Sequence, residues 1–413
     1  MGDYGGYEAR PRENYVRREV EVDDLWANSI SSGINFSKYD NIKITVDGEN
    51  KPTPIAKFTE AGLCSLLVSN VTRAGYTTPT PVQKNALPII MAGRDLMACA
   101  QTGSGKTAAF LLPMINKMIE TRADGRSTEG GRVAPQAIII TPTRELAIQI
   151  HDEARKFAGG SDIHSQVVYG GTSVMSQKGM LNRGCNILVA TPGRLLDFVE
   201  RGYVSFKQVQ FLVLDEADRM LDMGFMPDIR RCVDNVSMPA KNLRQTLMFS
   251  ATFPDEVRRS ARDFLHNQLF LQVGLVGGAC TDVKQSFHQA TKFEKRDQLL
   301  KILQDPTRNP RERTLIFVKT KRNADFLATY LSEEGLPTTS IHGDRLQRER
   351  EEALDDFKRG KMPILVATAV AARGLDIKDV MHVVNYDMPD EVEEYVHRYN
   401  SIYFKLLLLI RLI

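Results

Sequence analysis

The stretch AQTGSGKT, residues 100–107, decides how the rest of this chain is interpreted. It follows the apolar run DLMACA (95–100) and precedes AAFLLPMINKMI (108–119). A buried strand, a glycine-rich turn and a helix are therefore expected in that order, which is the context that a phosphate-binding loop requires. Ala100 stands where such loops usually have their first glycine, but the Gly-Lys-Thr core is intact.

Four residues of this loop have chemistry suited to a nucleoside triphosphate. Gly103 and Gly105 allow backbone N–H groups to close around phosphates at the N-terminus of a helix. The Lys106 ammonium can reach the β- and γ-phosphates, and the Thr107 hydroxyl can ligate Mg²⁺. The loop predicts a nucleotide-binding α/β domain.

A second motif, FLVLDEAD at 211–218, places two carboxylates after four apolar residues. In α/β sheets, ligands bind at the carboxyl ends of strands, which is where these carboxylates are expected. Asp215 can hold Mg²⁺ directly or through water, and Glu216 can polarise an attacking water as a general base. An acidic pair after a strand is by itself usually a solvated turn. Combined with the phosphate loop, it predicts hydrolysis of a nucleoside triphosphate.

Composition sets the outer limits of this interpretation. At 413 residues the chain is too long for one ordinary core, so two or more domains are expected. A formal net charge of +3 neither requires nor excludes nucleic acid, so any basic surface must be local. The five cysteines are dispersed, which favours reduced thiols in a cytosolic or nuclear compartment over a zinc knuckle or disulfide framework. The first residues have no apolar core region of the kind found in secretory signals.

Two series of short apolar runs divide the chain into two α/β domains. Continuous rather than alternating apolar runs are typical of parallel strands covered on both faces. The first series is at 137–141, 186–192, 209–216 and 245–252, and the second at 314–320, 338–343, 364–369 and 381–387. Segments predicted to be helical lie between these runs, at 145–158, 323–335 and 348–360.

The predicted boundaries follow from these series. Residues 1–35 are expected to be a disordered leader containing Gly, Arg and Tyr, which either touches RNA or is only flexible. A first domain is expected at 36–271, a linker at 272–284 and a second, partial domain at 285–413.

Further motifs, in this order, give the chain a close resemblance to a known family. They are GYTTPTPVQ (75–83), PTRELA (142–147), GG (170–171), TPGR (191–194), DEAD (215–218), SAT (250–252), LIFV (315–318), HGD (342–344) and ATAVAARGLD (367–376). The chain resembles the DEAD-box ATP-dependent RNA helicases over residues 36–398. GINFSKYDNIKI (33–44) and GLVGGACTDVKQ (274–285) are similar to the Vasa-type, germline-associated branch. The resemblance implies two tandem RecA-like domains with parallel sheets, the second incomplete.

The resemblance also implies residue roles. Tyr76 would stack on adenine and Gln83 would bond its edge, which suits an amide facing an adjacent donor and acceptor. Ser250 and Thr252 would link the ATP site to the RNA face. The implied ATP-binding set is Phe58, Tyr76, Gln83, Ala100, Gln101, Thr102, Gly103, Ser104, Gly105, Lys106, Thr107 and Asp376. The implied RNA-binding set is Arg144, Gly171, Thr191 and Arg194 in the first domain and Thr320, Gly343 and Thr368 in the second.

The mechanism implied by the resemblance is domain closure around ATP, Mg²⁺ and RNA, followed by hydrolysis that resets the open state. Phosphates and 2′-hydroxyls carry no base identity, so the grip on RNA would be independent of sequence. A cytoplasmic location, with ribonucleoprotein or germ granules as partners, is expected from the same resemblance. The residues that resemble the family's adenine site make a DNA translocase less favoured.

The family pattern breaks near the C-terminus. The family text reads H-R-x-G-R-x-x-R, whereas His397 and Arg398 are followed here by Asn400, Ser401 and Phe404 at the glycine and arginine positions. The displaced arginines would serve as arginine finger and γ-phosphate clamp. Poor ATP hydrolysis is therefore expected, and the alternative function is an ATP-gated RNA clamp or inactive isoform.

The last stretch, residues 403–413, is apolar but interrupted by Lys405 and Arg411. It is shorter than the roughly 20 residues that a spanning helix needs, so a membrane anchor is disfavoured. Because the family's second domain continues with a further strand and helix, this tail is expected either to cover exposed apolar surface partly or to promote aggregation.

Overall fold

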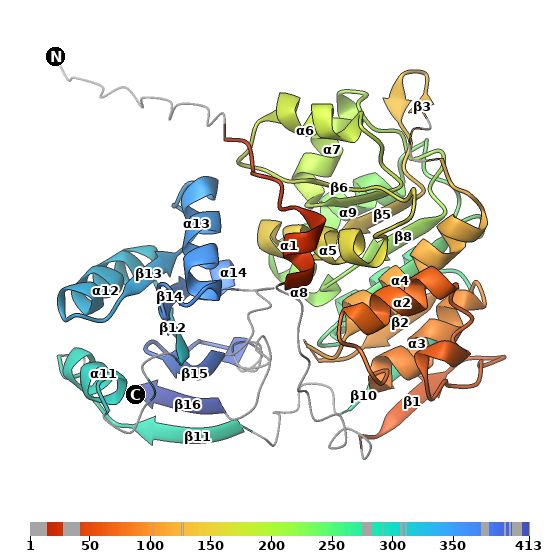
Figure 1. Ribbon diagram of the computed structural model, residues 1–413. Helices are drawn as coiled ribbons and strands as arrows, with labels where there is room; N and C mark the ends of the chain where they lie inside the picture. Colours follow the sequence, from red (N-terminus) through yellow and green to blue (C-terminus); the bar gives the residue numbers. More distant parts are fainter. Residues whose placement is uncertain are drawn as a thin grey trace.

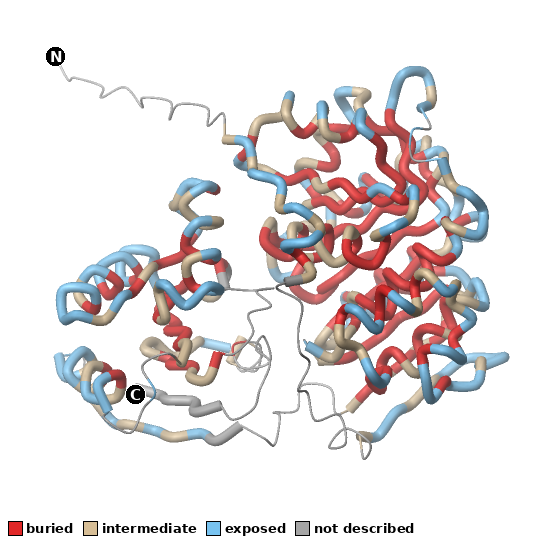
Figure 2. The backbone as a smooth tube through the Cα atoms, viewed as in Figure 1, coloured by how far each residue is buried: buried red, intermediate tan, exposed pale blue. Residues whose placement is uncertain are grey.

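The computed structural model describes residues 15–27, 42–101, 103–124, 126, 128–274, 283–291, 293–305, 309, 312–372, 380–391, 394–395, 398 and 407–412. Two α/β units follow one another along the chain, each built on its own sheet (Figure 1). Both are rich in buried strands with helices packed on them (Figure 2). The two-domain prediction is thereby confirmed.

The first sheet has the strand order β1-β10-β2-β9-β8-β5-β7-β6. Only the β1–β10 pair is antiparallel; the other pairs of this sheet are parallel. The strands are β1 (Ile44–Asp47), β2 (Leu96–Cys99), β5 (Ala137–Ile140), β6 (Ser165–Val168), β7 (Ile187–Ala190), β8 (Phe211–Leu214), β9 (Gln245–Ser250) and β10 (Leu269–Val273). The four first-domain strands predicted from apolar runs are β5, β7, β8 and β9.

Helices cover both faces of this sheet. Alternate residues of one strand enter different cores: Ile139 belongs to one hydrophobic cluster and Ile138 to the other. This two-sided burial explains why the strand sequences are continuously apolar. The helices are α2 (Ser65–Arg73), α3 (Pro81–Met91), α4 (Lys106–Glu120), α5 (Arg144–Phe157), α6 (Val174–Leu181), α7 (Pro192–Glu200), α8 (Ala217–Asp222), α9 (Met226–Val233) and α10 (Asp255–Phe264).

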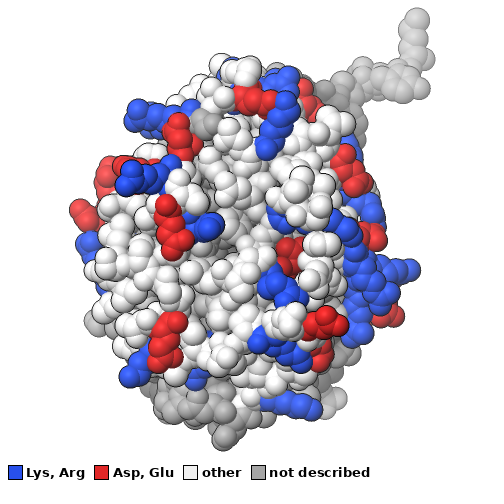
Figure 3. Space-filling view, turned by 90° about the vertical axis from the view of Figure 1, so that its right-hand side faces the viewer, with Lys and Arg blue, Asp and Glu red and all other residues white. Residues whose placement is uncertain are grey.

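Two small elements complete the first domain. A 3-10 turn, η2 (Phe58–Glu60), precedes α2, and a hairpin is formed by β3 (Thr128–Glu129) and β4 (Arg132–Val133). The outer face of this domain carries charges of both signs, interspersed among uncharged residues (Figure 3).

The second sheet has the order β11-β16-β15-β12-β14-β13, and its pairs are parallel. Leu315 and Ile316 on β12 again enter different cores, so this sheet is also covered on both faces. Its strands are β11 (Val283–His288), β12 (Arg313–Val318), β13 (Thr338–Ile341), β14 (Ile364–Thr368), β15 (Val380–Asn385) and β16 (Leu407–Leu412). Its helices are α11 (Lys295–Leu303), α12 (Lys321–Glu333), α13 (Gln347–Lys358) and α14 (Ala369–Ala372).

The apolar tail is a strand of this sheet. β16 runs parallel to β11 on one side and to β15 on the other, pairing Leu409 with Gln285 and with Val383. The expectation was that the tail would partly cover exposed apolar surface or promote aggregation; the structure adds that the tail forms a strand of the sheet. The tail occupies an interior position of the second sheet and connects β11 to the rest.

Part of the leader is also ordered on the first domain, which corrects the expectation of disorder for residues 15–27. Helix α1 (Val22–Ala27) packs against α5, and its Leu25 is buried. The predicted linker at 272–284 overlaps the end of β10 and the start of β11, and residues 275–282 lie outside the described residues. Among the described residues, no helix is long and apolar enough to cross a membrane.

Candidate functional site

The phosphate loop joins β2 to α4, as the sequence predicts. Gly103 has φ +78° and Gly105 has φ +87°, so both adopt the left-handed conformation that glycine tolerates best. A Cβ on Gly105 would lie 2.5 Å from Nε2 of Gln83, so the close approach of these two segments also requires glycine. Helix α4 begins at the next residue, Lys106, which leaves its first N–H groups facing the loop.

The lysine of the loop is already held in place. Lys106 is buried, and its Nζ donates a hydrogen bond to the carbonyl oxygen of Ala100 at 2.8 Å. The Ser104 hydroxyl is buried without a hydrogen-bond partner among the described residues. A buried, unpaired hydroxyl beside an ammonium and free helix N–H groups suits the oxygen-rich phosphates of a nucleotide.

The predicted adenine-site residue Gln83 lies against this loop. It is fully buried in a capping box at the start of α3, where Thr80 Oγ1 accepts from its N–H and its Oε1 accepts from the N–H of Thr80. Its Nε2 donates to the carbonyl oxygen of Gly105 at 3.1 Å. The amide thus connects the α3 start to the phosphate loop.

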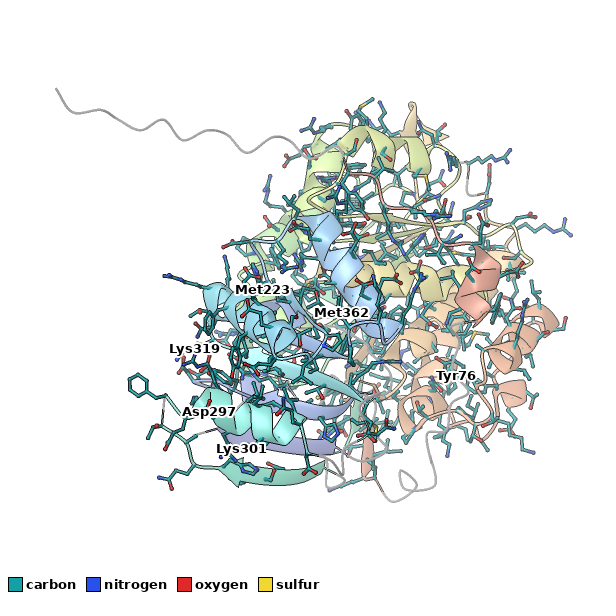
Figure 4. All side chains as sticks on the ribbon, turned by 60° about the vertical axis from the view of Figure 1, so that its left-hand side comes forward. Tyr76, Met223, Asp297, Lys301, Lys319 and Met362 are labelled. Carbon is teal, nitrogen blue, oxygen red and sulfur yellow. The ribbon has the colours of Figure 1, made fainter. Side chains whose placement is uncertain are left out.

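The two predicted aromatic residues of the adenine site contact each other. The rings of Phe58 and Tyr76 are 6.3 Å apart in an edge-to-face arrangement, and Tyr76 also meets Phe157 at 6.0 Å. Tyr76 lies among the helices of the first domain, well away from Lys319 and Asp297 of the second domain (Figure 4). These aromatic side chains therefore form a small cluster in the first domain.

The acidic pair follows β8, next to the phosphate-loop half of the sheet. Asp215 is buried, and burial raises the pKa of its carboxyl to about 7, against the opposing effect of Lys106. Glu216 adopts the left-handed conformation with φ +56°, which is strained for a residue with a side chain. Its Oε2 accepts from Nη1 of Arg219 at 3.2 Å, in a pair that is almost fully buried.

Asp218 is a site residue that the sequence analysis did not single out. Its Oδ2 accepts hydrogen bonds from the N–H of Ala251 and from both the N–H and the hydroxyl of Thr252, at 3.2, 2.7 and 2.8 Å. The Ser250 hydroxyl accepts from the Asp218 N–H at 3.2 Å. Asp218 therefore ties the acidic motif to the SAT motif. Its position as the last residue of the D-E-A-D motif is the sequence feature from which a functional role could have been predicted.

Two adjacent glycines accommodate Arg144 at the first of the predicted RNA contacts. Arg144 begins α5, and its guanidinium lies against Gly170 and Gly171. A Cβ on Gly171 would collide with Nη1 of Arg144, and φ at this glycine is +85°. Burial, together with nearby Arg350, lowers the pKa of Arg144.

The other first-domain residues lie on neighbouring strand ends. Thr191 is the N-cap of α7 directly after β7. Arg194, one helical turn on, donates to the carbonyl of Thr172 at 3.4 Å and to Oε1 of Gln177 at 3.1 Å. Because β5, β7 and β6 are adjacent in the sheet, these residues share one carboxyl edge with the phosphate loop and the acidic pair.

The second-domain set is arranged in the same way. Thr320 follows β12 and caps α12 by accepting from the Asn323 N–H, Gly343 follows β13, and Thr368 ends β14. These three strands are neighbours in the sheet. A Cβ on Gly343 would meet only Lys321 at 3.8 Å, so packing alone does not require glycine there. The predicted residues Thr102 and Asp376 lie outside the described residues.

Arg398, the motif arginine that remains, is bound within its own domain. Its Nη1 donates to Oδ1 of Asn385 at 2.8 Å and to the carbonyl of Asp387 at 2.7 Å. Its guanidinium lies 4.9 Å from the ring centre of Phe317 and is ion-paired with Glu394. This arginine therefore anchors the chain after β15 to the second sheet. The positions of Asn400, Ser401 and Phe404 lie outside the described residues.

The two carboxyl edges are joined through α13 of the second domain. Arg144 Nη1 donates to Oε1 of Gln347 at 2.9 Å, and Arg350 forms an ion pair with Glu145 at 2.8 Å. The Arg350 and Glu145 side chains are mostly buried in this pair. The helix thus packs its first turn against the start of α5.

Gly171→Ala is expected to destabilise the first domain more than Gly224→Ala does. Both glycines have positive φ, so both substitutions impose a left-handed strain of about 1–2 kcal/mol. Only the Cβ at residue 171 meets a neighbour; at Gly224 nothing lies within 4 Å. Denaturant unfolding of the two variants measures the difference. Equal losses would show that Arg144 moves aside without cost.

Comparisons with known proteins agree with this arrangement. Residues 80–260 match the DEAD/DEAH box helicase family, and residues 294–400 match the helicase conserved C-terminal domain. The Drosophila melanogaster protein "ATP-dependent RNA helicase vasa" is 54% identical over 94% of this chain and 58% of its own length. The chain thus spans little more than half of that relative. This similarity confirms the Vasa-type resemblance.

Solved structures give the same result for the fold. DEAD-box helicase Mss116 bound to ssRNA and UDP-BeF superposes with a TM-score of 0.78 at 30% identity, covering 86% of this chain and 74% of that one. RNA-helicase Prp28 from Chaetomium thermophilum bound to ADP gives 0.50 at 34% identity, covering 97% and 92%. Of these two superpositions, the one on the RNA-bound structure is the better. On these matches, and on the ordered motifs that line the two sheet edges, the chain belongs to the DEAD-box RNA helicase family.

Proposed function

We propose that this chain is an ATP-dependent RNA helicase that couples nucleotide binding between its domains to a grip on the RNA backbone and to local strand separation. The observation that best supports this proposal is that both sets of residues lie at the carboxyl edge of the first sheet. The phosphate loop follows β2, the SAT motif begins at the end of β9 and the acidic pair follows β8, while the proposed RNA contacts of this domain follow the adjacent β5, β7 and β6. In this proposal, nucleotide binding at one half of the edge shifts the RNA-contact residues at the other half.

Asp218 supports this coupling. It lies two residues after Glu216 and accepts hydrogen bonds from the backbone N–H and the hydroxyl of Thr252. A shift of α8 when the nucleotide site fills therefore moves the SAT segment, which ends β9. In this proposal Ser250 and Thr252 transmit the nucleotide state to the RNA face, as the sequence resemblance implies.

The nucleotide site has the groups that ATP and Mg²⁺ need. Lys106 and the N–H groups of the loop bind phosphate oxygens, and Glu216 orients the attacking water and accepts its proton. Thr107 and Asp215 would hold Mg²⁺, which offsets the phosphate charge and usually keeps several waters with few protein ligands. A bound cation also favours ionised Asp215, whose carboxyl is otherwise disfavoured as an anion by burial.

The proposed RNA contacts suit recognition of the backbone rather than the bases. Arg144 and Arg194 supply guanidinium donors, and Thr191, Thr320 and Thr368 supply hydroxyl or helix-terminal donors. Such groups bind phosphate and ribose oxygens irrespective of sequence. The proposal extends to a cytoplasmic location and ribonucleoprotein or germ-granule partners, for which the support is the Vasa-type resemblance.

Lys106→Ala is the sharpest test, because it does not depend on turnover. We expect RNA affinity to rise about 5- to 150-fold when Mg²⁺ and the non-hydrolysable analogue AMP-PNP are added, the usual range of coupling between two sites. Lys106→Ala should abolish this increase. Fluorescence anisotropy with a labelled oligouridine measures it.

Lys117→Ala, on the exposed side of the same helix, is the matched control and should behave as the unmodified chain. If AMP-PNP leaves RNA affinity of the unmodified chain unchanged, the proposed coupling is wrong.

A further inference from the structure

The ordered part of the leader, residues 15–27, lies along the first domain; we call it the leader strap. Arg17 forms an ion pair with Asp152 of α5 at 2.9 Å, and both side chains are mostly buried. Arg155, also on α5, donates to the carbonyl of Val20 at 2.7 Å. The strap is thus bound along α5, the helix that begins with Arg144.

The C-terminal part of the strap is held by apolar contacts. Leu25 of α1 is buried, and Trp26 packs on the first hydrophobic cluster with the Arg73 guanidinium 4.5 Å from its ring centre. Helix α1 has only six residues, so its own helical stability is small and these contacts must hold it. The strap therefore belongs to the first domain over its whole described length.

The other end of the strap reaches the second domain. The carbonyl oxygen of Tyr15 accepts from the Ser173 N–H at 3.0 Å, which fixes the backbone on the first domain. Its hydroxyl donates to Oε2 of Glu351 on α13 at 2.8 Å. The Tyr169 hydroxyl donates to Oε1 of the same carboxylate at 3.0 Å. Burial and the Glu351 charge raise the pKa of both tyrosines, so both remain donors.

This carboxylate also orients Gln347. Nε2 of Gln347 donates to Oε1 of Glu351 at 3.1 Å, so the other end of the amide, Oε1, accepts from Arg144. Gln347 is buried, which leaves the amide little freedom to turn over. A continuous set of hydrogen bonds therefore runs from the Tyr15 hydroxyl through Glu351 and Gln347 to the Arg144 guanidinium.

We propose that the leader strap joins the two domains and that Tyr15 is a positioning residue, acting through Glu351 and Gln347 on the RNA contact Arg144. The strap holds the Tyr15 hydroxyl at high effective concentration beside α13 only when the domains are together, so it favours the arrangement that presents both sets of RNA contacts. The predicted effect on RNA affinity rests on the proposed function. The predicted connection of the two domains by the strap does not depend on it.

The test compares Tyr15→Phe and Arg17→Ala with Tyr330→Phe in the full chain. Tyr15→Phe removes only the hydroxyl, and Arg17→Ala removes the ion pair that fixes the strap to α5 next to Tyr15. Tyr330 lies on α12 in the second domain, remote from the strap, and controls for losing a phenol oxygen. Small-angle X-ray scattering measures the fraction of protein with separated domains, without ligand and with AMP-PNP and oligouridine. Anisotropy measures RNA affinity.

We expect Tyr15→Phe and Arg17→Ala to increase the domain-separated fraction and weaken RNA binding about 3- to 10-fold, which is the range for the net contribution of one ordinary hydrogen bond. The double variant should bind RNA as tightly as the single variant with the lower RNA affinity, because both substitutions weaken the same connection between the domains. The thermal unfolding midpoint of the first domain should be unchanged in Tyr15→Phe, which excludes a merely structural role.

Scattering curves of both variants that match those of Tyr330→Phe would overturn the proposal. If no form of the chain binds RNA, the proposed function fails, but scattering without ligand still decides whether the strap joins the domains. If the domains separate while RNA affinity is unchanged, the positioning of Arg144 is refuted.

Discussion

Arginine at positions 401 and 404, with glycine at 400, is expected to raise RNA-stimulated ATP turnover of this chain by about 10³-fold or more. The sequence has Ser401 and Phe404 where the family motif has arginines. An arginine finger stabilises the charge that develops on the transferred phosphoryl group, and related enzymes lose about 10³ to 10⁵ in turnover without it. The other proposed catalytic residues, Lys106, Asp215 and Glu216, are all in the first domain.

The remaining motif arginine does not replace the missing pair. Arg398 is committed to Asn385, Asp387 and Glu394 of its own domain, with little of its surface exposed. Withdrawing it would leave these acceptors unpaired in a buried site, which is costly. Under the proposed function, the chain therefore keeps the ATP-binding groups of the first domain, while Ser401 and Phe404 stand at the positions of the two motif arginines.

The control separates position from charge. Arginine at Ile402 and Tyr403 adds the same charge in the same segment at the wrong spacing, and it should leave turnover low. Phosphate release at saturating ATP and RNA is the measurement. Equal turnover of the unmodified and the restored chains would show that another group completes the site.

The fold could be predicted from the sequence because burial on both faces makes each strand a continuous apolar run. AIIIT at 137–141 needs no tertiary information to be recognised, and β5 occupies four of those five residues. Local motifs likewise located the phosphate loop, since Gly103 and Gly105 must adopt positive φ wherever the loop forms. Such features depend on the neighbouring residues in the chain alone.

The remaining features depend on contacts between distant segments. Asp218 binds Thr252, 34 positions away, and Gly171 packs against the guanidinium of Arg144, so neither contact can be predicted from the neighbouring residues in the chain. The strap was expected to be disordered because its sequence is polar. Its stability comes from contacts with distant residues, such as the Arg17–Asp152 ion pair and the burial of Leu25, which composition does not reveal. The motifs mark Asp218 and Gly171 as residues of interest, but their contacts follow only from the folded chain.

The apolar tail is a strand whose partners, likewise, could not be predicted from local sequence. KLLLLIRLI has the composition of a buried strand, but its partners, β11 and β15, are set by the order of strands in the sheet. β11 has no other partner strand among the described residues, so its attachment to the second domain depends on β16. The second domain is therefore expected to be sensitive to changes in β16.

Leu409→Pro is accordingly expected to destabilise the second domain by about 3 kcal/mol or more, the scale of a proline inserted where its ring and missing N–H break regular structure. Leu409 pairs with Gln285 on one side and Val383 on the other, so the strand has no free edge on which proline is tolerated. Since whole domains are stable by only about 5–15 kcal/mol, a large part of that stability is lost.

Limited proteolysis and calorimetry distinguish the outcomes of this substitution. Leu409→Val keeps the backbone donor and suits a strand, so it is the matched control. In Leu409→Pro, cleavage should appear within residues 283–412 while the first domain keeps its unfolding transition, because β16 pairs only within the second sheet. Resistance equal to that of Leu409→Val would mean that the tail contributes no pairing that the domain needs. In that case, β11 must be held by contacts other than β16.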